Sequence, residues 1–440
     1  MLRAEPALPC AADGYTGLKI SMMFDRAYRQ RLDADLARWE ADGVITPAAG
    51  SAIRLALPPL SPGINIPIVV AIVGGLLIAA AFLAFVAAHW TEIARLLRFA
   101  MLLAGILVAH GLGAWFARAG RPVLADLCAG VGAIIFGAAI ALVGQMYHLG
   151  GDFAGGMLLW ALGALVAAAL TDSRGALAVA LAAACAWSCT RALETYEPHF
   201  SFVVIWLLAA GLALAWNSRV AAHLVAVATI PWWISTAVQP DFETAFVLAD
   251  GAALVFGAGL ALAATPWQRT NSAGAVLSIY GAFALAVVAA LQVVTANELF
   301  HSRSLLMGQP PWAIACGVAG VAFALAAAAM TRRAGPAFAA AAIALVLLAA
   351  LTWTPPKAGD PWLAYAFELC AMLCLVVSGM LDDSRPRIVA GWLGIAGVIA
   401  GITWAVKGSL LRRSAFLAVA GGVAVVLAIV LGRLLPRDRA

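Results

Sequence analysis

The stretch that decides the fold is residues 123–146, VLADLCAGVGAIIFGAAIALVGQM, in which one aspartate and one glutamine interrupt a run of apolar and small residues. An α-helix rises 1.5 Å per residue, so about 20 such residues cross a hydrocarbon core roughly 30 Å thick. A run of this length and composition is typical of a transmembrane helix.

The same pattern recurs from Ile64 to Leu435. Hydrophobic residues make up 64% of the sequence and charged residues 11%, and the mean hydropathy is +0.97. A water-soluble domain of this content would have more apolar surface than one core can cover. We therefore expect an all-α fold, a polytopic integral membrane helix bundle of about 14 (12–14) transmembrane helices. The expected spans are 64–88, 96–116, 123–146, 153–170, 175–191, 200–216, 219–238, 244–264, 273–295, 311–330, 335–353, 361–381, 387–405 and 414–435, of which 175–191, 200–216 and 219–238 are the weakest.

Small residues are concentrated in several of these spans. Gly130 to Gly137 and Ala341 to Ala350 are examples. Small side chains let helix backbones approach closely in a membrane, so these runs favour tight helix packing.

A short segment with helical punctuation precedes the first span. Leu32, Leu36 and Trp39 recur at three- and four-residue steps among charged residues, which indicates one amphipathic helix. Gly43 is suited to end that helix, and Pro47 fits the first helical position of a second one. Residues 25–60 therefore predict a cytoplasmic helical hairpin. It is interpreted either as a solvated pair packed on the membrane domain or as a docking module for a protein partner.

The remaining domain expectations concern the ends of the chain. Residues 1–22 lack the apolar region of a signal peptide and any helical period. Because Met22 and Met23 stand immediately before the helical pattern, we expect the biological start there and a disordered extension over residues 1–24. The transmembrane bundle is expected over residues 64–435, and a cytoplasmic tail over residues 436–440.

Lysine and arginine predict the orientation. With the N-terminus in the cytoplasm, 19 of the 27 basic residues fall on the cytoplasmic side and eight on the other, although the loops alone divide 9 to 8. Cytoplasmic loops carry an excess of basic residues, so both termini are expected inside. The formal net charge of +5 is thus interpreted as membrane topology, and no nucleic-acid partner is expected.

The richest polar cluster follows the span 123–146. It contains Gln145, Tyr147, His148 and Asp152. One interpretation is a polar, proton-responsive site at the outer membrane face, since His148 titrates near neutral pH and Asp152 can hold its tautomer. The other is a helix end closed by two glycines, with Tyr147 and His148 as interfacial anchors and Asp152 as the cap of the next helix.

Two carboxylates stand inside predicted spans. Asp250 and Glu368 each lie about seven residues from a span end and are candidate intramembrane carboxylates. Charged groups in lipid are costly, so each one needs a partner or a wet cavity. A structural contact to another helix and a proton or ion site are equally open.

Enzyme and metal-site signatures are missing from the sequence. It has no phosphate-binding loop, no zinc-protease motif and no serine nucleophile elbow. Cys185 with Cys189 and Cys370 with Cys374 are four apart, but no suitable zinc ligands accompany them, so they are interpreted as small buried hydrophobes. No catalytic residue, metal ligand or cofactor is assigned.

Two motifs resemble a known family. The segment LARWEADGVITP at residues 36–47, and Gln145, Tyr147 and His148 followed by Asp152 and Trp160, are similar to bacterial predicted membrane proteins grouped as domain of unknown function 2157. The resemblance implies a polytopic inner-membrane protein with a short cytoplasmic N-terminal hairpin. It implies no activity and assigns no catalytic residue.

Two functional hypotheses follow from these features. The leading one is a non-enzymatic, transporter-like inner-membrane protein that binds or moves a small or lipidic molecule between helices near the midplane of the bilayer. The alternatives are a membrane scaffold, or an embedded enzyme that acts on a lipid-linked envelope precursor. The enzyme would require Gln145, Tyr147, His148 and Asp152 to converge with Glu194, His199, Glu298 and His301.

Overall fold

The computed structural model describes residues 22–56, 73, 74, 77, 81, 84, 94–146, 152–239, 244–299, 310–352 and 362–405. These residues are all-helical, with no strand among them. The chain divides into two compact units, Met1–Gly74 and Gly75–Ala440, and each is considered by itself.

The first unit contains the expected helical hairpin. Helix α1 runs over Met22–Ala41 and α2 over Pro47–Ala56. Gly43 has a φ of +70°, in the left-handed region that favours glycine, and the Thr46 hydroxyl accepts a hydrogen bond from the Ala49 N–H at 3.2 Å. Leu36 is fully buried, and Arg54 of α2 pairs with Glu40 of α1 at 3.0 Å. The two helices and the turn that the sequence predicts for this segment are therefore confirmed.

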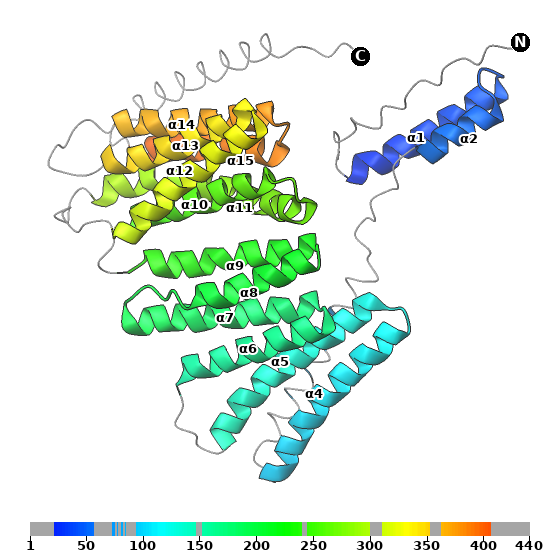
Figure 1. The fold of residues 1–440 in the computed structure, drawn as a ribbon, viewed down its shortest axis with the longest axis vertical. Helices are drawn as coiled ribbons and strands as arrows, with labels where there is room; N and C mark the ends of the chain where they lie inside the picture. The colour runs from blue at the N-terminus through cyan, green and yellow to red at the C-terminus, as the bar shows by residue number, and fades with distance from the viewer. Residues whose placement is uncertain are drawn as a thin grey trace, which may run out of the picture. The chain divides into compact units, whose positions relative to one another are not determined.

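The second unit contains twelve described helices that correspond to twelve of the fourteen expected spans (Figure 1). Eleven of them are long and apolar enough to cross a membrane. The two other expected spans, 64–88 and 414–435, lie largely or wholly outside the described residues. The helices are α4 (Arg95–Arg118), α5 (Pro122–Met146), α6 (Phe153–Thr171), α7 (Arg174–Thr195), α8 (Phe202–Ala215), α9 (Arg219–Ala237), α10 (Thr244–Ala263), α11 (Gln268–Leu299), α12 (Pro311–Thr331), α13 (Ala334–Thr352), α14 (Trp362–Leu381) and α15 (Arg385–Ala405).

Helix α8 is the exception in length. It has 14 residues, equivalent to about 21 Å, which is shorter than the hydrocarbon core. The corresponding span, 200–216, is one of the three that the sequence marks as weak.

The second unit has two hydrophobic cores. One is formed by buried residues of α5–α9 and the other by buried residues of α10–α15. A small third cluster, made of Ala237, Val247 and Ala313 with Trp233 and Trp312 against them, joins α9, α10 and α12. Figure 1 shows the same division, with α4–α9 stacked in chain order and α10–α15 grouped beyond them. We call these the N-terminal and C-terminal halves of the bundle.

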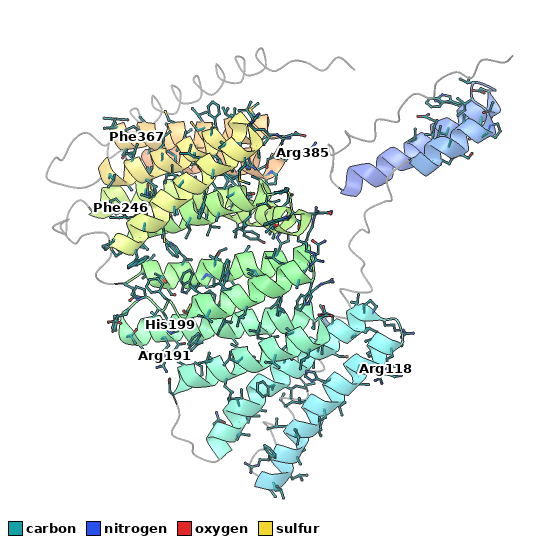
Figure 2. The ribbon with its side chains drawn as sticks, viewed as in Figure 1. Arg118, Arg191, His199, Phe246, Phe367 and Arg385 are labelled. Atoms are coloured by element: carbon teal, nitrogen blue, oxygen red, sulfur yellow. The ribbon has the colours of Figure 1, made fainter. Side chains whose placement is uncertain are left out.

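Helix ends gather on two sides of the bundle. The "turn end" holds the tight turns after α4, α6, α8, α10, α12 and α14, and the "loop end" is the opposite side, where α6, α8, α10, α12 and α14 begin. In Figure 2, Arg118 and Arg385 mark the turn end, whereas Arg191 and His199 mark the loop end.

A repeated tripeptide makes three of the tight turns. Asp or Asn, then Ser, then Arg occupies residues 172–174, 217–219 and 383–385. The first residue of each has a φ between +48° and +51°, which asparagine and aspartate tolerate better than other side chains. Ser173 and Ser218 then cap α7 and α9 by accepting from Ala176 N–H at 3.0 Å and Ala221 N–H at 3.3 Å. Local chemistry thus sets the reversals.

Candidate functional site

The polar cluster predicted after α5 is only partly described. Gln145 is exposed in the last turn of α5, and Tyr147 and His148 lie outside the described residues. Asp152 caps α6, because its Oδ1 accepts a hydrogen bond from the Ala154 N–H at 3.0 Å. Its Oδ2 pairs with Arg191 of α7, which also pairs with Glu194 at 3.3 Å. The described geometry of Asp152 is therefore that of a helix cap and an ion pair.

His199 lies near this ion pair at the loop end (Figure 2). Its Nδ1 is 3.2 Å from the Ser188 hydroxyl, and its ring meets the edge of Trp187 at a centroid distance of 4.4 Å. Burial, and then the positive charge of Arg191, lower the pKa of His199 below its ordinary value. The imidazole is therefore favoured in its neutral form.

These contacts bear on the enzyme hypothesis. His301 and the side chain of Glu298 lie outside the described residues, as Tyr147 and His148 do. Among the described groups, Asp152 and Glu194 share Arg191, whereas His199 contacts Ser188. The groups that can be located are engaged in capping, ion pairing and packing.

Asp250 lies inside the C-terminal half, on α10. Its side chain is buried, with the residue 5% exposed, and Oδ2 has no hydrogen-bond partner among the described residues. A Cβ added to Gly317 of α12 would overlap Oδ1 and would lie 3.2 Å from a methyl group of Leu347 of α13. The carboxyl thus occupies the space that glycine leaves where α10, α12 and α13 meet, with Cys316 close enough to interact electrostatically.

Glu368 is buried still more completely on α14. The residue is 0% exposed, and neither carboxyl oxygen has a hydrogen-bond partner among the described residues. Met372 lies one turn further along the same face of α14. A Cβ added to Gly394 of α15 would overlap the sulfur of Met372 and would lie 3.1 Å from the Cβ of Ala286 on α11, so the three helices meet at this point. Glu368 therefore faces the contact of α14 with α11 and α15.

Both carboxyls lie equally far along their helices. Asp250 is six residues after Thr244, where α10 begins, and Glu368 is six residues after Trp362, where α14 begins. At 1.5 Å per residue, each is about 9 Å inside the loop end. In Figure 2, Phe246 and Phe367, which precede them, lie at that end. We call the part of the C-terminal half at this distance from the loop-end helix starts the polar layer.

Gln292 of α11 joins this layer and was missed by sequence reasoning. It is 2% exposed, and its Nε2 donates to the Ala245 carbonyl of α10 at 3.3 Å. A glutamine in the expected span 273–295 was a usable signal, because strongly polar side chains in lipid ask for a partner as carboxylates do.

Asp126 of α5 is a second residue whose role needed the structure. Its Oδ1 accepts from the Ser173 hydroxyl at 2.6 Å and from the Gly175 N–H at 3.0 Å. It therefore binds the start of α7 from another helix. A tertiary cap of this kind leaves no local sequence pattern.

The comparisons with known proteins locate a family over part of the chain. The family described as "Predicted membrane protein (DUF2157)" matches residues 37–178, about a third of the chain. The resemblance inferred from the two motifs is thereby confirmed over this segment. The segment includes Gln145, Tyr147, His148 and Asp152 and ends before Asp250 and Glu368. No curated protein and no solved structure matches the chain.

Proposed function

We propose that this chain is a transporter-like protein of the bacterial inner membrane that binds or moves a small or lipidic molecule between helices of its C-terminal half. The observation that carries the proposal is the buried layer of Asp250 and Glu368. An unpaired polar group in an apolar interior costs about 2–7 kcal/mol, and an isolated ionised carboxylate costs more. Intramembrane carboxylates therefore mark ligand or ion pathways by default.

The division into two halves supports this proposal. Each half has its own hydrophobic core, and Trp233 of α9 contacts α10, where its Nε1 donates a hydrogen bond to the Val247 carbonyl at 2.7 Å. Transporters commonly bind their substrates between packed helices within the bilayer and move one bundle against another. A C-terminal half with its own hydrophobic core could move as a unit against the N-terminal half in this way.

The enzyme alternative has less support. It requires convergent reactive groups at the loop end, but Asp152 and Arg191 contribute to a helix cap and ion pairs. By contrast, no described donor neutralises Glu368. This difference between the paired acidic residue at the loop end and the unpaired Glu368 supports ligand binding within the bundle rather than catalysis at the loop end.

The proposal includes an orientation. The nine basic residues assigned to cytoplasmic loops stand in or next to the tight turns of the turn end, namely Arg118, Arg121, Arg174, Arg219, Arg269, Arg332, Arg333, Arg385 and Arg387. We therefore propose that the turn end faces the cytoplasm. The polar layer is then nearer the outer face. The hairpin α1–α2, with Val44 70% exposed in its turn, is proposed as a cytoplasmic surface for a protein partner.

Water access to the polar layer tests the transporter-like function without knowledge of the substrate. A variant that retains Cys316 alone of the seven cysteines would be treated with a membrane-impermeant thiosulfonate in sealed vesicles. A transport pathway predicts that Cys316 is modified from at least one side, because water must reach Asp250. Total thiol is measured after unfolding in SDS.

A matched control uses Cys370, which is exposed on the outside of α14. A variant with Cys370 alone should remain unmodified in the bilayer, since lipid keeps the charged, impermeant reagent away from a thiol on the outside of the helix. If Cys316 is as unreactive as Cys370 from both sides, while both react in SDS, the polar layer is closed to water and the transporter-like function is wrong.

A further inference from the structure

The charged residues of the C-terminal half are distributed unevenly. In the sequences of α10–α15, the acidic residues are Asp250, Glu298 and Glu368, and the basic residues are Arg269, Arg385 and Arg387. All three arginines stand in the first turn of a helix that begins at the turn end. Glu368 lies 13 residues before Leu381, hence about 20 Å from that end. No arginine of these helices is within reach of its carboxyl.

Among the described side chains of the helices packed against α14, none provides another charge opposite Glu368. Helices α11, α13 and α15 contact α14. Helix α13 has no charged residue, and α15 has only Arg385 and Arg387 at its start. Helix α11 contributes Arg269, Tyr280, whose hydroxyl lies 3.1 Å from His223 Nδ1, and Glu298, whose side chain is outside the described residues. On α14 itself, Tyr365, Cys370 and Cys374 are the remaining titratable groups.

The buried side chains on the helix face of Glu368 are mainly apolar. They include Ala364, Ala371, Met372 and Leu375, and Ala286 of α11 and Gly394 of α15 lie against Met372, one turn from Glu368. A metal cation needs several oxygen ligands in place of its water. The four apolar side chains on this helix face offer none, and Gln292 would add a single amide oxygen. A proton needs only the carboxyl oxygen itself.

We infer that Glu368 is a proton-binding site, which takes up H⁺ when its layer is closed and releases it when water reaches the layer. This inference rests on the proposed transporter-like function and makes that function proton-coupled. The balance is simple: one O–H bond forms on the carboxylate when the proton enters from water, and the same bond breaks when the proton leaves. Asp250, in the same polar layer, is the second carboxyl that the pathway offers.

Thermal unfolding as a function of pH tests the inference. The purified full-length protein in detergent would be melted between about pH 6 and about pH 9, with its 15 tryptophans as the fluorescence probe. The unfolded chain has an ionised glutamate across this range, whereas a buried, unpaired carboxyl keeps its proton in the fold. The melting temperature of the wild type should therefore fall by about 1–2 °C per pH unit until Glu368 ionises in the fold, and the dependence should level off above that point. Glu368→Gln, which mimics the neutral acid, should remove this dependence.

Asp172→Asn is the matched control. Asp172 is exposed and is the first residue of one of the repeated turns. Asn217 occupies the equivalent position of another of these turns, so an asparagine side chain is compatible with this conformation. This variant should follow the wild-type curve. If Glu368→Gln also follows it, Glu368 exchanges no proton in this range and the inference is wrong. Recovery of the high-pH melting temperature by NaCl, but not by choline chloride, would replace the proton with a sodium ion and would also overturn the inference.

A second measurement covers the case in which Glu368→Gln does not fold. Dicyclohexylcarbodiimide, an apolar reagent, adds to protonated carboxyls, and peptide mass spectrometry of the labelled wild type identifies the residue. Labelling of Glu368 that declines as pH rises supports the inference, and pH-independent labelling contradicts it. If Cys316 is modified but Glu368 does not titrate, the transporter-like function stands without proton coupling. If Glu368 titrates but Cys316 is unreactive, only the transporter-like function is refuted.

Discussion

A close helix contact in the C-terminal half gives a sharp stability prediction. Helices α10 and α12 cross at Gly257 and Gly320, where a Cβ on either residue would lie well inside 3.0 Å of the other helix's backbone atoms. Backbone cannot rotate away as a side chain can. Gly257→Ala must therefore push the two helices apart or strain them.

The magnitude follows from two opposing contributions. Overpacking a tight interior costs about 1–3 kcal/mol, and the upper part of that range applies here because backbone is the obstacle. Replacing a helical glycine with alanine returns about 0.5–1 kcal/mol through reduced backbone entropy. The net expected loss is about 2 kcal/mol, or more than tenfold in the folding equilibrium.

Gly211 provides the matched comparison. It lies in α8, it is exposed, and a Cβ added there has nothing within 4 Å. Gly211→Ala should be neutral or stabilising by up to about 1 kcal/mol. Both variants would be unfolded by increasing SDS in mixed micelles, with tryptophan fluorescence as the readout. If Gly257→Ala is as stable as Gly211→Ala, the close approach of α10 and α12 is wrong.

Three further predictions concern the two helix ends. Asp152→Asn keeps a capping oxygen but loses the ion pair with Arg191. Because the Asp152 and Arg191 side chains are 42% and 34% exposed, the expected loss of stability is below about 0.5 kcal/mol. Asp152→Ala also removes the cap and should lose about 1 kcal/mol more. Equal losses in SDS unfolding would contradict the capping role. Because the pKa of His199 is lowered in the fold, the unfolded chain binds more protons at this residue than the folded chain does. The stability that neutral His199 contributes is therefore fully present above its ordinary pKa of 6.5. That stability is lost as pH falls from 6.5 towards the lowered pKa. His199→Gln should flatten the melting curve on the acid side, and an unchanged slope would refute the assignment. Finally, a fluorescent protein fused after Arg333 should fluoresce and alkaline phosphatase fused after Glu197 should be active; the reverse result would invert the proposed orientation.

The sequence predicts the helices well because membrane spans impose a strong constraint. An apolar run near 20 residues long has few alternatives to a helix, and twelve expected spans correspond to α4–α15. Boundaries are less certain where polar residues extend a helix. Helix α11 has 32 residues, from Gln268 to Leu299, against the expected 273–295, because Gln268 and Asn271 continue the helix beyond its apolar part.

Roles that depend on two distant residues could not be predicted in the same way. Asp126 lies near the start of the expected span 123–146, but its contact with Ser173 joins residues 47 apart. The pairing of Asp152 with Arg191 joins residues 39 apart. By contrast, the depth of Asp250 and Glu368 follows from helix length alone, so both could be singled out from the sequence.

The ion pairs at the helix ends indicate why those two carboxyls differ from the other acidic residues. Among the described residues of the bundle, Asp152 pairs with Arg191 at the loop end and Asp382 pairs with Arg387, at 2.5 Å, at the turn end. The chain thus supplies an arginine where an acidic side chain helps to fix a helix end. Structural need alone would have provided Glu368 with a similar donor or replaced it with a hydrophobe, because an unpaired buried acid destabilises the fold. Its presence without a described donor is the observation that a purely structural role fails to explain.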